Sequence, residues 1–464
     1  AARAVALGCK NCIHFNPVAA VQAVRPCACQ VRDHTSAHSA RSGGQVGETV
    51  METYLLDWAN LLLRWLHVIT AIAWIGSSFY FVFLDNNLIR PTSPDLLEKG
   101  VDGAIWAVHG GGFYNPQKYM VAPKKIHTHL HWFYWESYST WLSGFSLFVV
   151  LYVWNAGTYL IDKSVMDWVP ATAVGAALAF LVAFWLLYDG ICRVFGFRKH
   201  GDAIVGGLVL VVIALACWLA TELFAGRAAF LLVGAMIATA MSANVFFWII
   251  PGQRKMVAAM TATEKVPPGS LAIHGKRGKQ RSVHNTYFTL PVIFAMLSNH
   301  YSFLYTHAHN WLILLVMMVA GAAIRQYFVM RHGYKLGRNR NPLPYAVVGA
   351  VLILATIVAL APTPRPVSAA AAGGAGVPAA SAGPVTFAQV QPVLAQRCFS
   401  CHGESVQMKN IRLDQPDQVK LHALAMYQQV VVTRQMPMNN ATGITDDERA
   451  LVGRWFEAGA PVTP

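Results

Sequence analysis

The sequence has little charge, and acidic residues are the scarcest charged group. Of its 464 residues only 12% are charged, with 22 Asp and Glu against 36 Lys and Arg. A soluble domain is typically about a quarter charged, so this composition excludes an ordinary soluble protein. Hydrophobic residues make up 55% of the chain and include 14 Trp. Such a composition is typical of a protein that crosses a membrane several times.

The first 50 residues lack an initiator methionine and the apolar core of a secretory signal peptide. They also lack an amphipathic period, and a strong membrane start, Met-Glu-Thr-Tyr-Leu-Leu, follows at Met51. Four of the eight cysteines lie here, at a spacing that could bind zinc: Cys9, Cys12, Cys27 and Cys29. Because this stretch has no apolar core, we expect residues 1–50 to be a disordered or mis-assigned leader.

Residues 51–362 contain about eight apolar stretches, each long enough to span a bilayer as a helix. They lie at 58–84, 132–154, 170–196, 203–224, 228–251, 284–305, 309–330 and 343–362. Lys and Arg are concentrated after the first, third, fifth and seventh stretches, as in cytoplasmic loops. We therefore predict an all-α membrane bundle with both termini on the outer side. This topology accounts for the net charge of +14, so nucleic-acid binding is not expected.

The chain ends in a second, smaller unit. Residues 363–385 are rich in Ala, Pro and Gly, which predicts a flexible linker. Residues 386–464 have the length of a small soluble domain and begin with an amphipathic stretch from Phe387. A helix is predicted from Thr445, because Glu448 three residues later completes a capping box.

The sequence Cys398-Phe-Ser-Cys-His402 is the attachment motif of a c-type haem. Cys398 and Cys401 would form the two thioether bonds, and His402 would ligate the iron. A zinc or redox dithiol pair is the alternative, and the adjacent histidine disfavours it. Met436 and Met438 are candidates for the second axial ligand, and we favour Met436 because it directly precedes a proline.

This motif also predicts a compartment, since haem is attached to C-x-x-C-H in the bacterial periplasm. The charge asymmetry of the membrane part gives the same orientation independently. We therefore expect a multi-pass protein of the bacterial inner membrane, with a cytochrome c domain at 386–464 in the periplasm.

Polar side chains inside the predicted spans mark the candidate site, because they are costly in a bilayer. Toward the cytoplasmic third lie Glu136, Asp189, Asn244, His284, Asn285 and Arg325, and near the middle lies His67. Each has a structural alternative. Glu136 or Asp189 could form an ion pair with Arg193 or Arg325, while His284 and Arg325 lie near span ends where they could reach water or the headgroups. His67 could be a packing residue or part of an electron or proton route. His67 and His300 could also ligate a b-type haem, the one candidate for a second cofactor.

Several motifs of the membrane part match a known family. They include Asp57-Trp-Ala-Asn-Leu-Leu-Leu-Arg-Trp-Leu-His67, His109-Gly-Gly-Gly-Phe-Tyr, Trp135-Glu136 and Trp141-Leu-Ser-Gly144. In these motifs the chain resembles the membrane-bound bacterial urate hydroxylases, over about residues 51–464. The resemblance implies eight transmembrane helices with a C-terminal cytochrome c domain. It also implies oxidation of urate to 5-hydroxyisourate in purine breakdown, with electrons passed to haem and then to an acceptor such as a cytochrome oxidase.

Urate is a planar anion with carbonyl and N–H edges, which Arg and Asn can recognise with paired hydrogen bonds. We therefore predict a substrate site with Arg325, Asn244, His284 and Asn285. Glu136, Asp189 and His67 are the predicted catalytic residues, the two acids as candidate bases. Two alternatives remain open, a quinol-oxidising membrane subunit and a transporter or anchor with a fused cytochrome.

Overall fold

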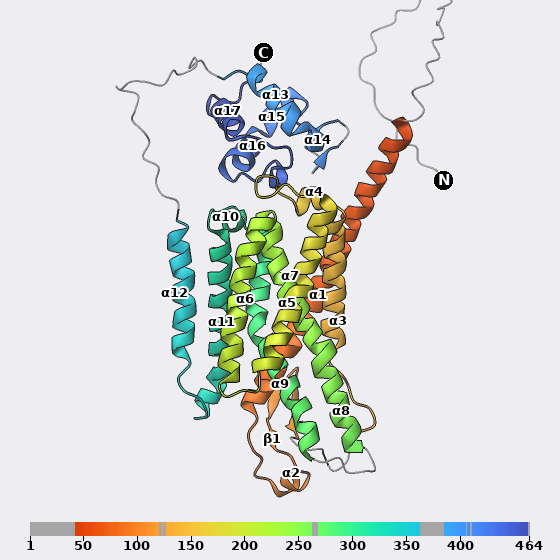
Figure 1. The fold of residues 1–464 in the computed structure, drawn as a ribbon, viewed down its shortest axis with the longest axis vertical. Helices are drawn as coiled ribbons and strands as arrows, with labels where there is room; N and C mark the ends of the chain where they lie inside the picture. Colours follow the sequence, from red (N-terminus) through yellow and green to blue (C-terminus); the bar gives the residue numbers. More distant parts are fainter. Residues whose placement is uncertain are drawn as a thin grey trace, which may run out of the picture. The chain divides into compact units, whose positions relative to one another are not determined.

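The computed structural model describes residues 42–119, 123, 127–261, 268–361, 385–404, 406–408 and 411–462. These residues form a mostly helical fold (Figure 1), as the sequence predicts. Within the predicted leader, residues 1–41 lie outside the described residues. Within the predicted linker, residues 363–384 also lie outside them.

Five of the described helices are long and apolar enough to cross a membrane, which confirms a multi-pass membrane protein. They are α1 (Ser42–Asn87), α5 (Pro170–Phe195), α6 (Gly201–Leu223), α7 (Gly226–Asn244) and α11 (Asn310–Lys335). The last turn of α7 continues through a π-helical segment, η2 (Val245–Ile249), into α8 (Ile250–Thr261). These helices are apolar around most of their circumference, as helices in a membrane must be.

Three further predicted spans are helical, but none of their described helices is both long and apolar enough to be counted with these five. The stretch at 132–154 forms α3 (Trp135–Phe148) and the π-helix η1 (Val149–Val153). The stretch at 284–305 lies mostly in α9 (Pro268–Leu297), whose first half is strongly basic, and the last stretch forms α12 (Leu343–Ala359). The count of eight spans therefore stays a prediction.

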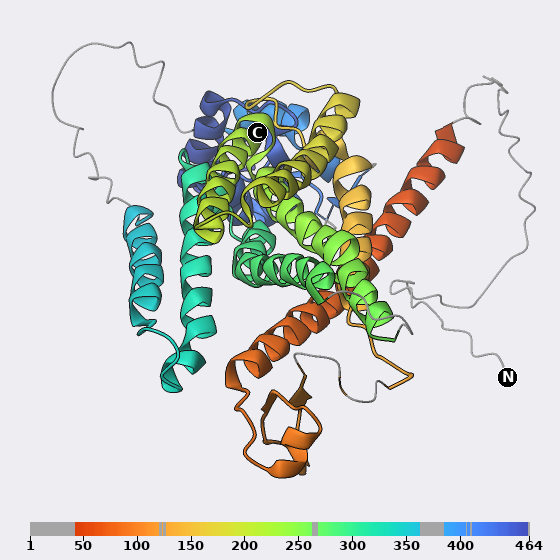
Figure 2. The same ribbon diagram turned by 60° about the horizontal axis from the view of Figure 1, so that its bottom comes forward.

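The connection after α1 folds into a small extended unit that leaves the bundle (Figure 2). After α2 (Pro94–Glu98), β1 (Gly103–Ala104) pairs with β4 (Gln117–Lys118), and β2 (Ala107–His109) pairs with β3 (Gly112–Tyr114), both antiparallel. Gly110 and Gly111 join β2 to β3 with φ of 57° and 78°. Glycine adopts these angles without strain, so the three-glycine motif forms a hairpin turn here.

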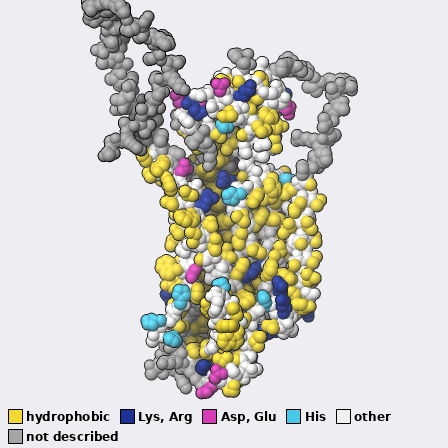
Figure 3. Space-filling model, turned by 180° about the vertical axis from the view of Figure 1, so that it is seen from behind, with side chains coloured by type: hydrophobic (Ala, Val, Ile, Leu, Met, Phe, Trp, Pro, Cys, Tyr) yellow, Lys and Arg dark blue, Asp and Glu magenta, His cyan; other side chains and the backbone are white. Residues whose placement is uncertain are grey.

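The core of the bundle lies around α5, α6 and α7. Small residues such as Ala173, Ala177 and Ala229 are completely buried there, which lets helix backbones approach closely. By contrast, the outer faces carry exposed Leu, Ile and Val side chains, and hydrophobic atoms predominate over the helices seen in Figure 3. Short elements connect the helices: α4 (Ala156–Tyr159), η3 (Ser298–His300) and α10 (Ser302–Tyr305).

Residues 385–462 have a hydrophobic core of their own around the fully buried Trp455. Their elements are α13 (Phe387–Arg397), α14 (Phe399–His402), α15 (Pro416–Leu421), α16 (Ala423–Met426), the π-helix η5 (Tyr427–Val432), the 3₁₀ helix η6 (Met438–Asn440) and α17 (Asp446–Glu457). The predicted capping box is present, since Thr445 Oγ1 accepts from the Glu448 amide and the Glu448 side chain accepts from the Thr445 amide. It fixes the first turn of α17.

Candidate functional site

Three of the predicted substrate-binding residues meet in one buried hydrogen-bonded cluster. Asn244 Nδ2 donates to the Asn285 side chain at 2.9 Å and to the Tyr188 hydroxyl at 3.0 Å. The Tyr188 hydroxyl is also hydrogen-bonded to His284 Nδ1, at 2.8 Å. These residues come from α5, α7 and α9, so the cluster joins three helices. Tyr188 was not among the sequence candidates, although it directly precedes Asp189.

Asp189 lies beside this cluster in an ion-pair network that we call closed because both of its carboxylate oxygens are occupied, although Arg281 Nη1 is buried without a described partner. Its carboxylate accepts from Arg193 Nε and Arg281 Nη2, both at 2.6 Å, and from the Trp248 indole at 2.8 Å. Asp189 and Arg281 are both buried, and the Arg281 guanidinium also lies 4.8 Å from the centre of the Tyr188 ring. The alternative of an ion pair with Arg193 is therefore observed, and Arg281 is a second partner that the sequence reasoning missed.

Glu136 lies in the first turn of α3, where the chain enters the bundle. Its Oε2 atom is buried and has no hydrogen-bond partner among the residues that the structure describes. The neighbouring Ser137 hydroxyl lies 3.1 Å from that of Ser242 on α7, so the start of α3 is fixed to α7 two residues before Asn244. Asn244 Oδ1 is likewise buried without a described partner.

Arg325 on α11 is 6% exposed, and its guanidinium carbon lies 3.8 Å from the centre of the Phe79 ring on α1. Its Nε and Nη2 atoms are buried, and no acceptor for them lies in the described part of the chain. These two atoms form the side edge of the guanidinium fork, which donates two parallel hydrogen bonds to a planar acceptor. Arg412 uses the same edge to bind Asp414, at 3.0 and 2.5 Å.

His67 connects α1 to α3. Its Nδ1 donates to the Thr140 carbonyl oxygen at 3.0 Å and lies 3.3 Å from the Ser143 hydroxyl. A Cβ atom added at Gly144 would lie 2.7 Å from the His67 ring, so only glycine allows this approach. These contacts fit a packing role for His67, and its predicted catalytic role stays a prediction.

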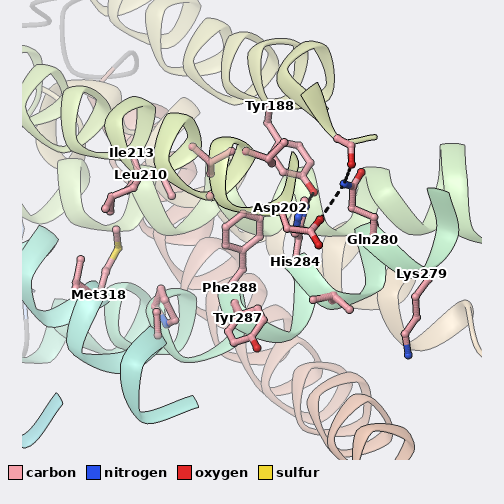
Figure 4. Close-up of a pocket in the computed structure, with 18 of the residues that line it drawn as sticks. Tyr188, Asp202, Leu210, Ile213, Lys279, Gln280, His284, Tyr287, Phe288 and Met318 are labelled. Atoms are coloured by element: carbon pink, nitrogen blue, oxygen red, sulfur yellow. Dashed lines mark hydrogen bonds between the residues drawn. The ribbon is translucent and has the colours of Figure 1, made fainter. Parts of the chain in front are cut away.

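A cavity of about 920 Å³ lies between α5, α6, α9 and α11 (Figure 4). It reaches the polar cluster at Tyr188 and His284, but Glu136, Asn244 and Arg325 are not among its lining residues. The large cavity and the unpaired buried groups are therefore distinct features.

In the C-terminal domain, the Cys398–His402 motif forms a single helical turn. The Cys398 carbonyl accepts from the amides of Cys401 at 3.1 Å and His402 at 2.9 Å. Residues three and four positions apart share one face of a helix, so both thiols and the imidazole lie on the same side. Neither thiol is in a disulfide, and burial together with the neighbouring Cys401 raises the pKa of Cys398 to about 11.

Met436 packs against the core of this domain, and its backbone is held on both sides. Its amide donates to the Gln429 carbonyl at 3.0 Å. Its carbonyl accepts from Arg449 Nη1 at 2.8 Å, and the same nitrogen donates to the Val430 carbonyl at 2.5 Å. Arg449 on α17 is itself buried, and sequence reasoning did not select it.

The comparisons with known proteins give one match. The family described as urate oxidase N-terminal matches residues 53–361, which include every predicted site residue of the bundle. No curated protein and no solved structure matches the chain. Because the matched range is about two thirds of the sequence, the chain belongs to the urate oxidase N-terminal family.

Proposed function

We propose that this protein oxidises urate to 5-hydroxyisourate within its helix bundle and passes the electrons to a c-type haem in its C-terminal domain. In balanced form, urate and one water give 5-hydroxyisourate, two protons and two electrons. The family suggests a role in urate oxidation. The observation that carries the proposal for the site is the unpaired fork edge of the buried Arg325.

A buried guanidinium without an acceptor is costly, since desolvation is not repaid by hydrogen bonds. A planar anion that presents two adjacent acceptors would satisfy both Nε and Nη2 of Arg325 at once. Urate has such edges, where a carbonyl oxygen lies beside a ring nitrogen. The Phe79 ring against the same guanidinium restricts the plane in which the fork can lie.

Glu136 and Asn244 supply the complementary chemistry. The Oε2 atom of Glu136 is free to accept a proton as urate is oxidised, and a positioned carboxylate is a common general base. The Oδ1 atom of Asn244 is free to accept from an N–H group of the substrate. Their helices are neighbours in contact, since α7 packs on both α3 and α9, and α9 packs on α11 with Arg325.

The cluster of Tyr188, His284 and Asn285 holds Asn244 in position. With Nδ2 of Asn244 donating to both Asn285 and Tyr188, its oxygen must point away from them. The closed network around Asp189 fixes Tyr188 from the other side, through Arg281. We assign Asp189 this positioning role, because its carboxylate oxygens are already occupied.

The C-terminal domain fits a covalently bound haem. Cys398 and Cys401 would hold it by thioether bonds, and His402 and Met436 would be its axial ligands. Both thiols lie on the face of the turn that carries the imidazole, and the Arg449 contact fixes the Met436 loop. When bound, the haem accepts one electron at a time. The motif supports a periplasmic location for this domain and an inner-membrane location for the bundle, in a bacterium.

The proposal is tested with membranes that carry the protein, mixed anaerobically with urate while the haem c absorption is followed. Urate should reduce the haem of the parent protein. Arg325→Gln should lower kcat/KM for urate by about 100-fold or more, because a buried charged partner of the substrate is lost. Arg331→Gln, an exposed site on the same helix, is the matched control. No reduction by urate in the parent protein would overturn the function, and equal rates in both variants would overturn the site.

The same experiment distinguishes the proposed function from its two alternatives. A quinol-oxidising subunit would show haem reduction with a quinol and none with urate. A transporter with a fused cytochrome would show neither.

A further inference from the structure

The cavity between α5, α6, α9 and α11 has two ends of different chemistry (Figure 4). One end carries Lys276, Lys279, Gln280 and Asp202, near the start of α6 and the basic half of α9. The other end is lined by apolar side chains of α6 and α11: Leu210, Ile213, Leu315 and Met318. Such a lining suits an amphiphile, with a polar head and a hydrocarbon chain.

The length of the cavity matches half a bilayer. From Asp202 to Ile213 the axis of α6 rises by about 16 Å, at 1.5 Å per residue. The hydrocarbon core of a bilayer is about 30 Å thick, so one leaflet accounts for about 15 Å. The polar end therefore lies at the level of the headgroups and the apolar end near the middle of the membrane.

The cavity opens toward the surrounding bilayer. Leu210 on α6 and Val283 on α9 both line it, yet they are 46% and 38% exposed. The helix α6 packs against α5, α7 and α11, and Gly206 leaves space beside it, because a Cβ atom there would meet nothing within 4 Å.

The side chains that line the polar end carry a small net positive charge, which favours an anionic head. Two lysines and one aspartate line it. Asp202 accepts a 3.5 Å hydrogen bond from Gln280, whose amide also donates to the Gly196 carbonyl. Lys279 lies 3.1 Å from Asp85, whereas Lys276 is exposed and forms no ion pair with any residue in the described ranges. Positive charge at this depth attracts anionic lipids, at about 1 kcal/mol for each Lys near the surface.

The cavity is not suited to the proposed substrate. Urate is small and planar with polar edges on all sides, and most of this lining is apolar. The polar groups that reach its deeper part, Tyr188 and His284, are already bonded to each other at 2.8 Å. We infer that the cavity binds a phospholipid with an anionic headgroup, its phosphate at Lys276 and Lys279 and one acyl chain along Leu210 and Ile213.

This inference is independent of the urate reaction and is tested by lipid binding. The full-length protein is exchanged into nanodiscs of phosphatidylglycerol in phosphatidylcholine, released, and examined by native mass spectrometry for retained lipid. The parent should retain phosphatidylglycerol preferentially. The double variant Lys276→Gln with Lys279→Gln should lose about 5- to 30-fold in this affinity, the equivalent of ~1 kcal/mol for Lys276 and at most as much again for Lys279, which is paired with Asp85. The double variant Lys335→Gln with Arg340→Gln, at exposed positions outside the cavity, is the matched control.

A second pair of variants tests the apolar end without changing charge. Gly206→Leu places a side chain in the cavity and should displace the lipid, whereas Gly207→Leu is the control. A Cβ atom meets nothing within 4 Å at either glycine, but only Gly206 lines the cavity. Equal retention in the paired variants of either set, or equal retention of both lipids by the parent, would overturn the proposal. So would retention of an added quinone in place of phosphatidylglycerol.

Discussion

Two sets of buried polar groups lie in the helix bundle, and they differ in how completely they are paired. Around Asp189 both carboxylate oxygens accept hydrogen bonds, from Arg193, Arg281 and Trp248, and among these groups only Arg281 Nη1 is buried without a described partner. At Arg325 and Glu136 the buried polar atoms have no acceptor or donor among the residues that the structure describes. A closed network stabilises the fold and has little capacity left for a ligand. An open set costs stability until a ligand completes it, so the comparison separates structural from binding residues.

The largest loss of stability is expected when the closed network around Asp189 is broken. Asp189→Asn removes the charge that compensates the buried Arg281, and losing one partner of a buried pair costs about 3–5 kcal/mol. The unfolding temperature of the purified protein in detergent should fall sharply. Asp167→Asn, at an exposed position, should leave it unchanged.

A double variant sharpens this result. Asp189→Leu with Arg281→Met removes both charges and should recover most of the lost stability. If stability returns but turnover stays low, the positioning role of Asp189 and Arg281 is supported, because the double variant also removes the contact between Arg281 and Tyr188. If the recovered protein oxidises urate at the parent rate, neither residue positions the site and the assigned role is wrong.

The next largest effect is expected on turnover, when Glu136 of the open set is changed. Glu136→Gln keeps the shape of the side chain but removes its basicity, so kcat for urate should fall by about 100-fold or more with little change in KM. The measurement is the initial rate of haem reduction at saturating urate, with haem content checked in each preparation. Glu98→Gln on the exposed helix α2 is the control. A kcat within twofold of the parent would exclude Glu136 as the base.

Whether the sequence predicts an interaction depends on how many residues separate its two partners along the chain. The motif at Cys398–His402 is contained in one helical turn, so its geometry follows from its spacing. Asp189 and Arg193 lie four residues apart on one helix, so the sequence also predicted this pair. Arg281 was not, because its partner lies 92 residues away on α5. Its position three residues before His284 on α9 was the available signal.

The same reasoning explains what the sequence could not resolve at Arg325. Its position within an apolar stretch identifies a costly buried charge. Whether a neighbouring helix supplies an acceptor depends on packing across α1, α9 and α11, which no local pattern encodes. The number of membrane spans is hard to predict from the sequence for a similar reason, since α9 combines an apolar half with a basic half that extends the helix.

A smaller effect is expected in the C-terminal domain, where Arg449 donates to two backbone carbonyls. Arg449→Gln should cost about 1–3 kcal/mol, because the Met436 and Val430 carbonyls lose a buried donor. If Met436 is the axial ligand, the near-infrared band of methionine-ligated haem should weaken and the midpoint potential should fall. Arg454→Gln, exposed on the same helix, is the control. An unchanged band together with lowered stability would leave Arg449 with a purely structural role.

The smallest expected effect concerns a pair that is closed but only partly buried. Arg397 donates to both carboxylate oxygens of Glu448 at 3.0–3.2 Å. Burial alone would raise the pKa of Glu448, but its hydrogen bonds with Arg397 and with the Thr445 amide outweigh burial and lower it. A lowered pKa in the folded state means that the carboxylate stabilises the domain above its unfolded pKa, about 4.3. This stabilisation is lost as the pH falls through the folded value.

Because the pair is near the surface, its contribution should stay below about 1 kcal/mol. The protection of residues 445–457 against hydrogen exchange in the full-length protein, measured by mass spectrometry relative to the intrinsic exchange rate at each pH, should therefore fall modestly between about pH 5 and pH 3. Glu448→Gln retains the side-chain acceptor of the capping box but removes the charge, so this acid-dependent step should disappear. Asp447→Asn, an exposed acid in the same turn, should keep it. If Glu448→Gln instead destabilised the domain as strongly as Asp189→Asn does the bundle, burial would not be what separates strong from weak ion pairs in this protein.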